Sequence, residues 1–108
     1  MYSPNQTINN PLKALDALYQ TGYRSNTLER ALTKIVDIEI AIAHRQHTEI
    51  QTKIQNYEQQ YQITSEDFYQ RFNRGELGDT ADFVEWSVFY DLRQAIRDRL
   101  KILQPQAD

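Results

Sequence analysis

A seven-residue repeat of apolar positions runs through the middle of this chain of 108 residues. Its members follow one another at gaps of four and three residues and are Val36, Ile40, Ala43, His47, Ile50, Ile54, Tyr57 and Tyr61. Side chains at this spacing lie along one side of an α-helix, which a second helix then covers. Neither glycine nor proline interrupts the 52 residues between Gly22 and Gly75. The pattern predicts one long helix over residues 26–62, about 55 Å long at ~1.5 Å per residue.

Residues 38–42 also carry a pattern that a β-strand would show. They read Ile-Glu-Ile-Ala-Ile, which alternates between apolar and other positions, and β-branched side chains favour strands. We prefer the helical interpretation because the seven-residue repeat continues unbroken beyond this segment.

Start and stop signals predict three shorter helices around the long one. Asn10 followed by Pro11 is a favourable helix start, and Thr64 and Asp79 are suitable N-cap residues for two later helices. We therefore expect helices over residues 11–20, 26–62, 65–73 and 80–103. The polar residues 1–9 are expected to form a flexible lead, and residues 10–108 a single helical domain.

The last predicted helix is apolar on two faces. Its main face contains Trp86, Phe89, Leu92, Ile96, Leu100 and Leu103. A second stripe contains Val84, Val88, Ala95 and Ile102, with Asp91 and Asp98 between them. A hairpin of two helices covers one face of each helix, and an uncovered apolar patch favours association. We expect an all-α fold, a long antiparallel helical hairpin with short flanking helices, which pairs into a four-helix homodimer core.

Composition and charge narrow the classes of partner. The chain has a net charge of -3 and no cysteine. Disulfides and cysteine-bound metal are thereby excluded, and the charge gives no general attraction to nucleic acid or to an anionic membrane. No secretory signal and no run of ~20 apolar residues is visible in the sequence. The expectation is a cytoplasmic protein with no membrane partner, for which nucleic acid is a poor ligand.

Two sets of polar residues are candidates for binding a metal ion. His44 and His47 have a spacing that can present two imidazoles to a metal, and Asp79, Asp82 and Glu85 can offer carboxylates to a cation. Two histidines are too few ligands, and acidic residues at a helix start stabilise the helix dipole. With no Ser-His-Asp set and no glycine-rich phosphate loop in the sequence, we expect no metal, no cofactor, no catalytic residue and no enzymatic activity.

The C-terminal half of the last predicted helix carries a strip of basic residues. Arg93, Arg97 and Lys101 recur every four residues, so they share one side of the helix. Such a strip can bind the acidic surface of another protein or a row of phosphates. It can equally be a solvated face that complements the C-terminal end of the helix dipole.

One stretch resembles a known kind of protein. Residues 68–79 read FYQRFNRGELGD and residues 82–86 read DFVEW. This pattern is similar to that of small helical antitoxins of prokaryotic toxin–antitoxin modules, of the TumA type, over roughly residues 40–103. The resemblance implies a protein that neutralises a toxin by helical contact. It directs attention to Phe72, Leu77, Phe83 and Trp86 as anchors for a partner, although all four can instead be core residues.

The expected function is therefore a protein–protein interaction module, most simply an antitoxin-like one. The alternatives are a self-associating, coiled-coil-like structural protein without a toxin partner, and an autoregulatory protein that binds nucleic acid. The residues expected to contact a partner or a second copy are Ile40, Ile50, Ile54, Phe72, Leu77, Phe83, Val84, Trp86, Val88, Ile102, Arg93, Arg97 and Lys101.

Overall fold

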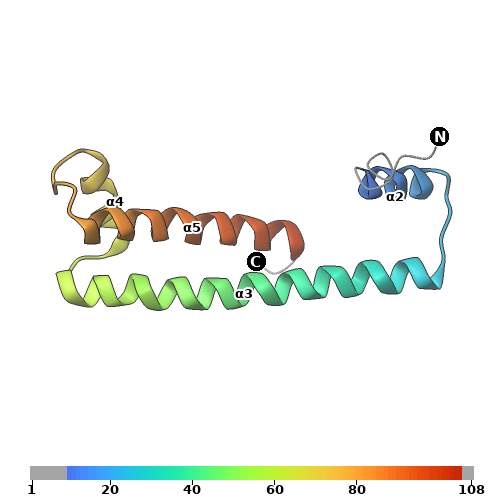
Figure 1. Ribbon diagram of the computed structural model, residues 1–108, viewed down its shortest axis with the longest axis horizontal. Coiled ribbons are helices and arrows are strands. Elements are labelled where there is room, and N and C mark those ends of the chain that lie inside the picture. Colours follow the sequence, from blue (N-terminus) through green and yellow to red (C-terminus); the bar gives the residue numbers. More distant parts are fainter. Residues whose placement is uncertain (1–9, 106–108) are drawn as a thin grey trace, which may run out of the picture. The chain divides into compact units, whose positions relative to one another are not determined.

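The computed structural model describes residues 10–105, which form four helices and no strand (Figure 1). The helices are α2 (Pro11–Gln20), α3 (Asn26–Tyr61), α4 (Ser65–Asn73) and α5 (Ala81–Leu103). Together they contain 81% of the described residues. The all-α prediction is confirmed, and the strand interpretation of residues 38–42 is wrong because the long helix runs through them. The expected flexible lead, residues 1–9, lies outside the described residues.

The helices begin close to the predicted positions, and one of the predicted caps is wrong. Thr64 does cap α4, since its hydroxyl accepts a hydrogen bond from the backbone N–H of Asp67 at 3.2 Å. For α5 the cap is Thr80, which accepts from the N–H of Phe83 at 3.4 Å, and Asp79 lies one residue too early. The predicted cap Asn10 precedes α2 but makes no side-chain hydrogen bond to it.

The chain divides into two compact units, and the division falls inside α3 between Ile35 and Val36. The first unit contains α2 and the start of α3. There the Tyr19 hydroxyl donates to Glu29, and the Arg24 guanidinium lies 3.7 Å from the centre of the Tyr19 ring. The single domain expected over residues 10–108 stays a prediction.

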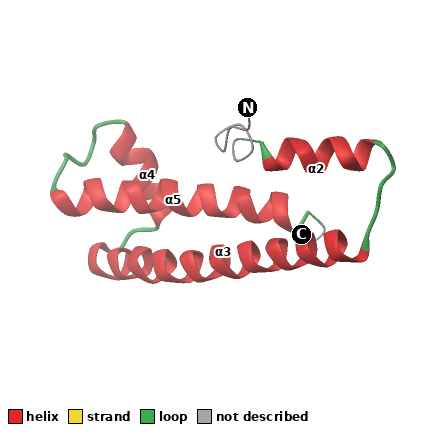
Figure 2. Cartoon of the chain, turned by 45° about the vertical axis from the view of Figure 1, so that its right-hand side comes forward, coloured by secondary structure: helices red, strands yellow, loops and turns green. Residues whose placement is uncertain are grey.

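The second unit is the predicted antiparallel hairpin. Helix α5 runs beside the later part of α3, and α4 lies across one end of the pair, as both views show (Figure 2). Contacts between side chains step in opposite directions along the two helices: Tyr61 bonds Asp82, Gln51 bonds Arg93 and His47 bonds Arg97. This order shows that α3 and α5 are antiparallel.

An aromatic cluster forms the core of the hairpin. Ile54, Phe68 and Trp86 are completely buried, one from each of the three helices. The rings of Phe68 and Trp86 stack with their centres 3.9 Å apart and their planes within 4°. The indole N–H of Trp86 donates to the hydroxyl of buried Ser65 at 2.9 Å, so the one polar atom of the indole is satisfied.

Replacing Ser65 by alanine should lower the free energy of unfolding by about 1–3 kcal/mol, because the buried indole N–H loses its acceptor. Urea denaturation followed by helical circular dichroism measures the change. Ser87→Ala is the matched control, since the Ser87 hydroxyl bonds only the carbonyl of Val84 in its own helix. Equal losses in the two variants would contradict the role given to Ser65.

Candidate interaction surface

The residues predicted to contact a partner fall into three groups in the structure. Ile54, Trp86 and Arg93 are buried within the chain. Another five are partly buried: Ile40, Ile50, Phe72, Leu77 and Phe83. The remaining five are exposed: Val84, Val88, Arg97, Lys101 and Ile102. The residues predicted from the sequence to contact a partner therefore include both interior residues of the hairpin and residues of its outer face.

The proposed aromatic anchors belong to the core. Trp86 has no exposed surface, and Phe72, Leu77 and Phe83 pack against the cluster of Ile54, Phe68 and Trp86. Ile54 and Trp86 are thus corrected from partner contacts to core residues, because α3 and α4 of the same chain already cover them. A hollow of about 500 Å³ opens beside this cluster, bordered by residues that include Tyr61, Leu77 and Phe83.

Two residues of the basic strip form hydrogen bonds within the chain. Arg93, which was predicted to contact a partner at the surface, is buried inside the hairpin. Its side chain is only 6% exposed, and it donates to Gln51 of α3 at 3.0 Å and to Glu66 of α4 at 3.1 Å. The planar guanidinium suits this task because its donors can reach two acceptors at once. Arg97 donates to the imidazole Nε2 of His47 at 3.1 Å. Of the three predicted basic residues, Arg93 and Arg97 thus hold the hairpin together.

The two histidines act as hydrogen-bonding residues of the hairpin. The His44 ring nitrogen lies 3.2 Å from the side-chain oxygen of Gln104, and His47 accepts from Arg97. No group of three or more His, Asp or Glu side chains placed to hold a metal ion is found among residues 10–105. Burial lowers the pKa of His47 below its usual value of 6.5, and the positive charges of Arg97 and Arg93 lower it further.

Three tyrosines join the hairpin helices through carboxylates. The hydroxyl of Tyr57 donates to Glu85, that of Tyr61 to Asp82 and that of Tyr69 to Asp91. These hydrogen bonds raise the pKa of each tyrosine, and burial raises it further. Sequence spacing gave no sign of these pairs, because the partners are 21 to 28 residues apart along the chain.

The outer face of α5 carries four of the large apolar side chains that are exposed in the second unit, where Val36 and Ile38 of α3 are exposed as well. Val84, Val88 and Leu92 are 45%, 48% and 44% exposed, and Ile102 is 80% exposed. We call Val84, Val88, Leu92, Ala95 and Ile102 the α5 stripe. Leu92 was expected on the buried face, but at 100° per residue it lies roughly 120° around the helix from Trp86, beyond the cover that α3 gives.

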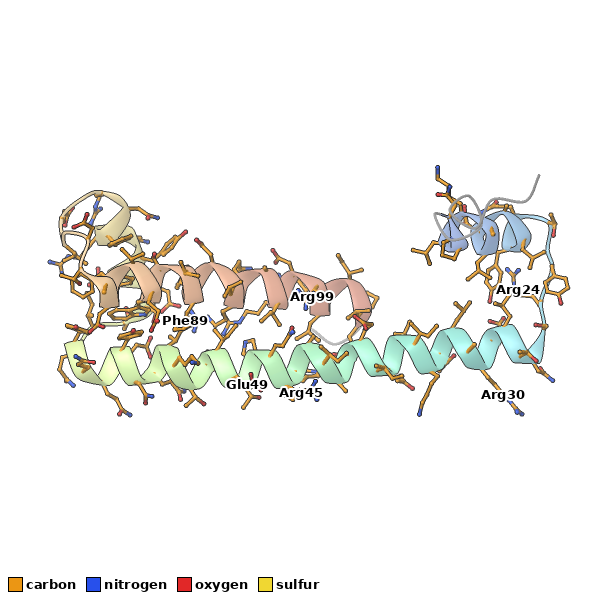
Figure 3. The ribbon with its side chains drawn as sticks, viewed as in Figure 1. Arg24, Arg30, Arg45, Glu49, Phe89 and Arg99 are labelled. Atoms are coloured by element: carbon orange, nitrogen blue, oxygen red, sulfur yellow. The ribbon has the colours of Figure 1, made fainter. Side chains whose placement is uncertain are left out.

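A hollow between α3 and α5 continues the stripe. It has a volume of about 270 Å³ and is lined by Gln46, Glu49, Ile50, Leu92, Ala95, Ile96 and Arg99. Ile50 and Ile96 form its apolar part, while Arg99 crosses it to donate to Gln46 at 3.0 Å. Phe89 of α5 also points into the space between α3 and α5 and packs against the aromatic cluster (Figure 3). The stripe and the hollow together make one apolar surface with charged residues at its border.

Comparison with models of protein families, with curated proteins and with solved structures finds no match to this chain. The likeness of residues 68–86 to helical antitoxins therefore stays a prediction. Among the described residues, no helix combines the length and the apolar character needed to cross a bilayer.

Raising the pH above about 10 should weaken the fold, and Tyr57→Phe should reduce that dependence. A raised pKa means that the folded chain keeps its tyrosine protons while the unfolded chain releases them. The stabilisation is therefore complete below pH ~10 and is lost as the pH rises further. Urea midpoints between pH 8 and pH 11 measure the slope. Tyr23→Phe, at an exposed position outside the hairpin, is the control and should leave the slope unchanged.

Acidification should weaken the fold through His47. Because its pKa is lowered in the folded chain, the stabilisation is present above pH ~6.5 and is lost as the pH falls through the folded value. His47→Gln keeps an acceptor for Arg97 and should flatten the loss of unfolding free energy between pH 7 and pH 5. Gln55→Asn, at an exposed position of α3, is the control and should keep the full acid loss. A full acid loss in His47→Gln would contradict this assignment.

Proposed function

We propose that the chain is a helical protein–protein interaction module whose contact surface is the α5 stripe. The observation that carries the proposal is that Val84, Val88, Leu92 and Ile102 remain substantially exposed, although the opposite side of α5 packs against its own chain. Covering one such side chain contributes about 1.5–3 kcal/mol when burial is complete. The four exposed side chains on one helix therefore favour a partner that covers them.

The finer part of the proposal is that the partner is a toxin, which the module neutralises by covering it. The support is the resemblance of residues 68–86. In the fold these residues form α4, a turn with positive φ at Gly75 and Gly78, and the start of α5. The motif thus sets how α5 is held against α3. It leaves the α5 stripe free for contact, in keeping with an inhibitor that acts through a helical face.

Recognition of nucleic acid is the less favoured alternative. Arg93 is buried against Gln51 and Glu66, and Arg97 bonds His47. A phosphate backbone would have to compete with these contacts, and the chain as a whole carries a net charge of -3. Self-association is the stronger alternative, because the charges of α5 complement those of a second copy.

Co-expression with the product of the neighbouring gene tests the toxin proposal. That product alone should arrest growth of the host cell, and this chain should restore growth and co-purify with it. Val88→Asp/Ile102→Asp should abolish both effects, because the contact would bury two unpaired charges. Thr48→Asp/Gln59→Asp is the matched control, since it adds the same two charges at exposed positions of α3 outside the stripe. Neutralisation that survives in Val88→Asp/Ile102→Asp would contradict the role of the stripe.

A further inference from the structure

The charges exposed on α5 are separated along the helix. The first half carries Asp82, Glu85 and Asp91 and no basic residue. The second half carries Arg97, Arg99 and Lys101, with Asp98 as its only acid. Two such helices side by side attract each other when they run antiparallel and repel when they run parallel.

The stripe is also symmetric about one residue. Glu85 and Arg99 each lie seven residues from Leu92, and on the same side of the helix because seven residues make nearly two turns. Val88 and Ala95 lie four residues before and three after Leu92, and Val84 and Ile102 eight before and ten after. Each apolar residue of the stripe therefore has a counterpart at a similar distance on the other side of Leu92.

We propose that the occupant of the α5 stripe is a second copy of this chain, bound through an antiparallel α5–α5 contact with its two-fold axis at Leu92. The proposal rests on the stripe's role as a contact surface, and it names a second copy of the chain, in place of a toxin, as the partner that covers it. A two-fold contact is self-complementary, so every pairing occurs twice. Leu92 then meets Leu92 of the second copy, Glu85 faces Arg99, and Val84 lies two residues, about 3 Å along the helix, from the level of Ile102.

The surroundings of the stripe fit this occupant. The hollow of about 270 Å³ beside Leu92, with Ile50 in its wall, gives room for apolar side chains of the second α5. Glu85 and Arg99 keep free hydrogen-bonding capacity, because Glu85 accepts one bond from Tyr57 and Arg99 donates one to Gln46. Asp91, the one acid close to the axis, accepts a hydrogen bond from Tyr69 of α4 in the same way.

Cysteine crosslinking tests the position of the axis. The chain contains no cysteine, so any disulfide in a single-cysteine variant joins two copies. Leu92→Cys should oxidise to a covalent dimer, because a residue on a two-fold axis lies beside its own copy. Gln94→Cys, exposed on the same helix away from the stripe, should oxidise at least about tenfold more slowly for want of that proximity. Equal rates in the two variants would overturn the proposal.

Charge reversal tests the pairing of Glu85 with Arg99. Glu85→Arg and Arg99→Glu should each weaken the dimer by about tenfold or more, because two attractive pairs become repulsive. The double variant should recover the affinity of the unmodified chain. Within one chain the two positions lie about 21 Å apart at 1.5 Å per residue, so rescue reports contact between copies. A double variant as weak as the single ones would overturn the pairing.

Light scattering of the unmodified chain at tens of micromolar should show a dimer, and a monomer would overturn the inference. Circular dichroism of each variant confirms that the helices remain. A monomer that still neutralises the neighbouring gene's product would overturn the second copy as occupant and leave the proposed function standing. A dimer with the Leu92 crosslink but without neutralisation would overturn the toxin proposal alone.

Discussion

The hairpin depends on the contact between Trp86 and Phe68. This stacked pair, with Ile54 beneath it, is where α3, α4 and α5 meet without exposed surface. Stacking supplies apolar burial, and the hydrogen bond from the indole to Ser65 makes that burial possible for a ring with a polar atom. Arg93 repeats the arrangement two turns further along α5, since it reaches Gln51 of α3 and Glu66 of α4. The rotation of α5 about its own axis follows from these two anchors.

That rotation decides which residues face outward. With Trp86 and Arg93 turned inward, Val84, Val88 and Ile102 must lie on the far side of α5, where no element of the hairpin covers them. The same constraint leaves Leu92 at the border, in the wall of the hollow between α3 and α5. The exposed stripe is thus a consequence of the core, because α3 and α4 cover only part of the circumference of α5 and the rest stays in contact with water.

The elements of the fold were predictable from the sequence, whereas the roles of several residues were not. Apolar spacing and the positions of glycine and proline predicted all four helices, because these signals are local. The burial of Arg93 depends on acceptors 42 and 27 residues away, and its spacing on the helix is the same as that of a surface cation. The exchange of Asp79 for Thr80 as the cap of α5 is a shift of one residue, which composition does not resolve because both types are good caps. Trp86 and Phe72 could be read either as anchors for a partner or as core residues until the packing of α4 was known.

The charge pattern of α5 has two physical causes that act on different residues. Acids at the start of a helix and bases at its end stabilise the helix dipole, and this accounts for Asp82 and Lys101 without any partner. The dipole acts within the first and last turns, so it does not account for Glu85 or Arg99, which lie further in and each form a hydrogen bond with a side chain of α3. Those two residues border the apolar stripe at equal distances from Leu92. In the proposed self-pairing, a second copy that presents the same stripe in the opposite direction gives both Glu85 and Arg99 a counterpart of opposite charge.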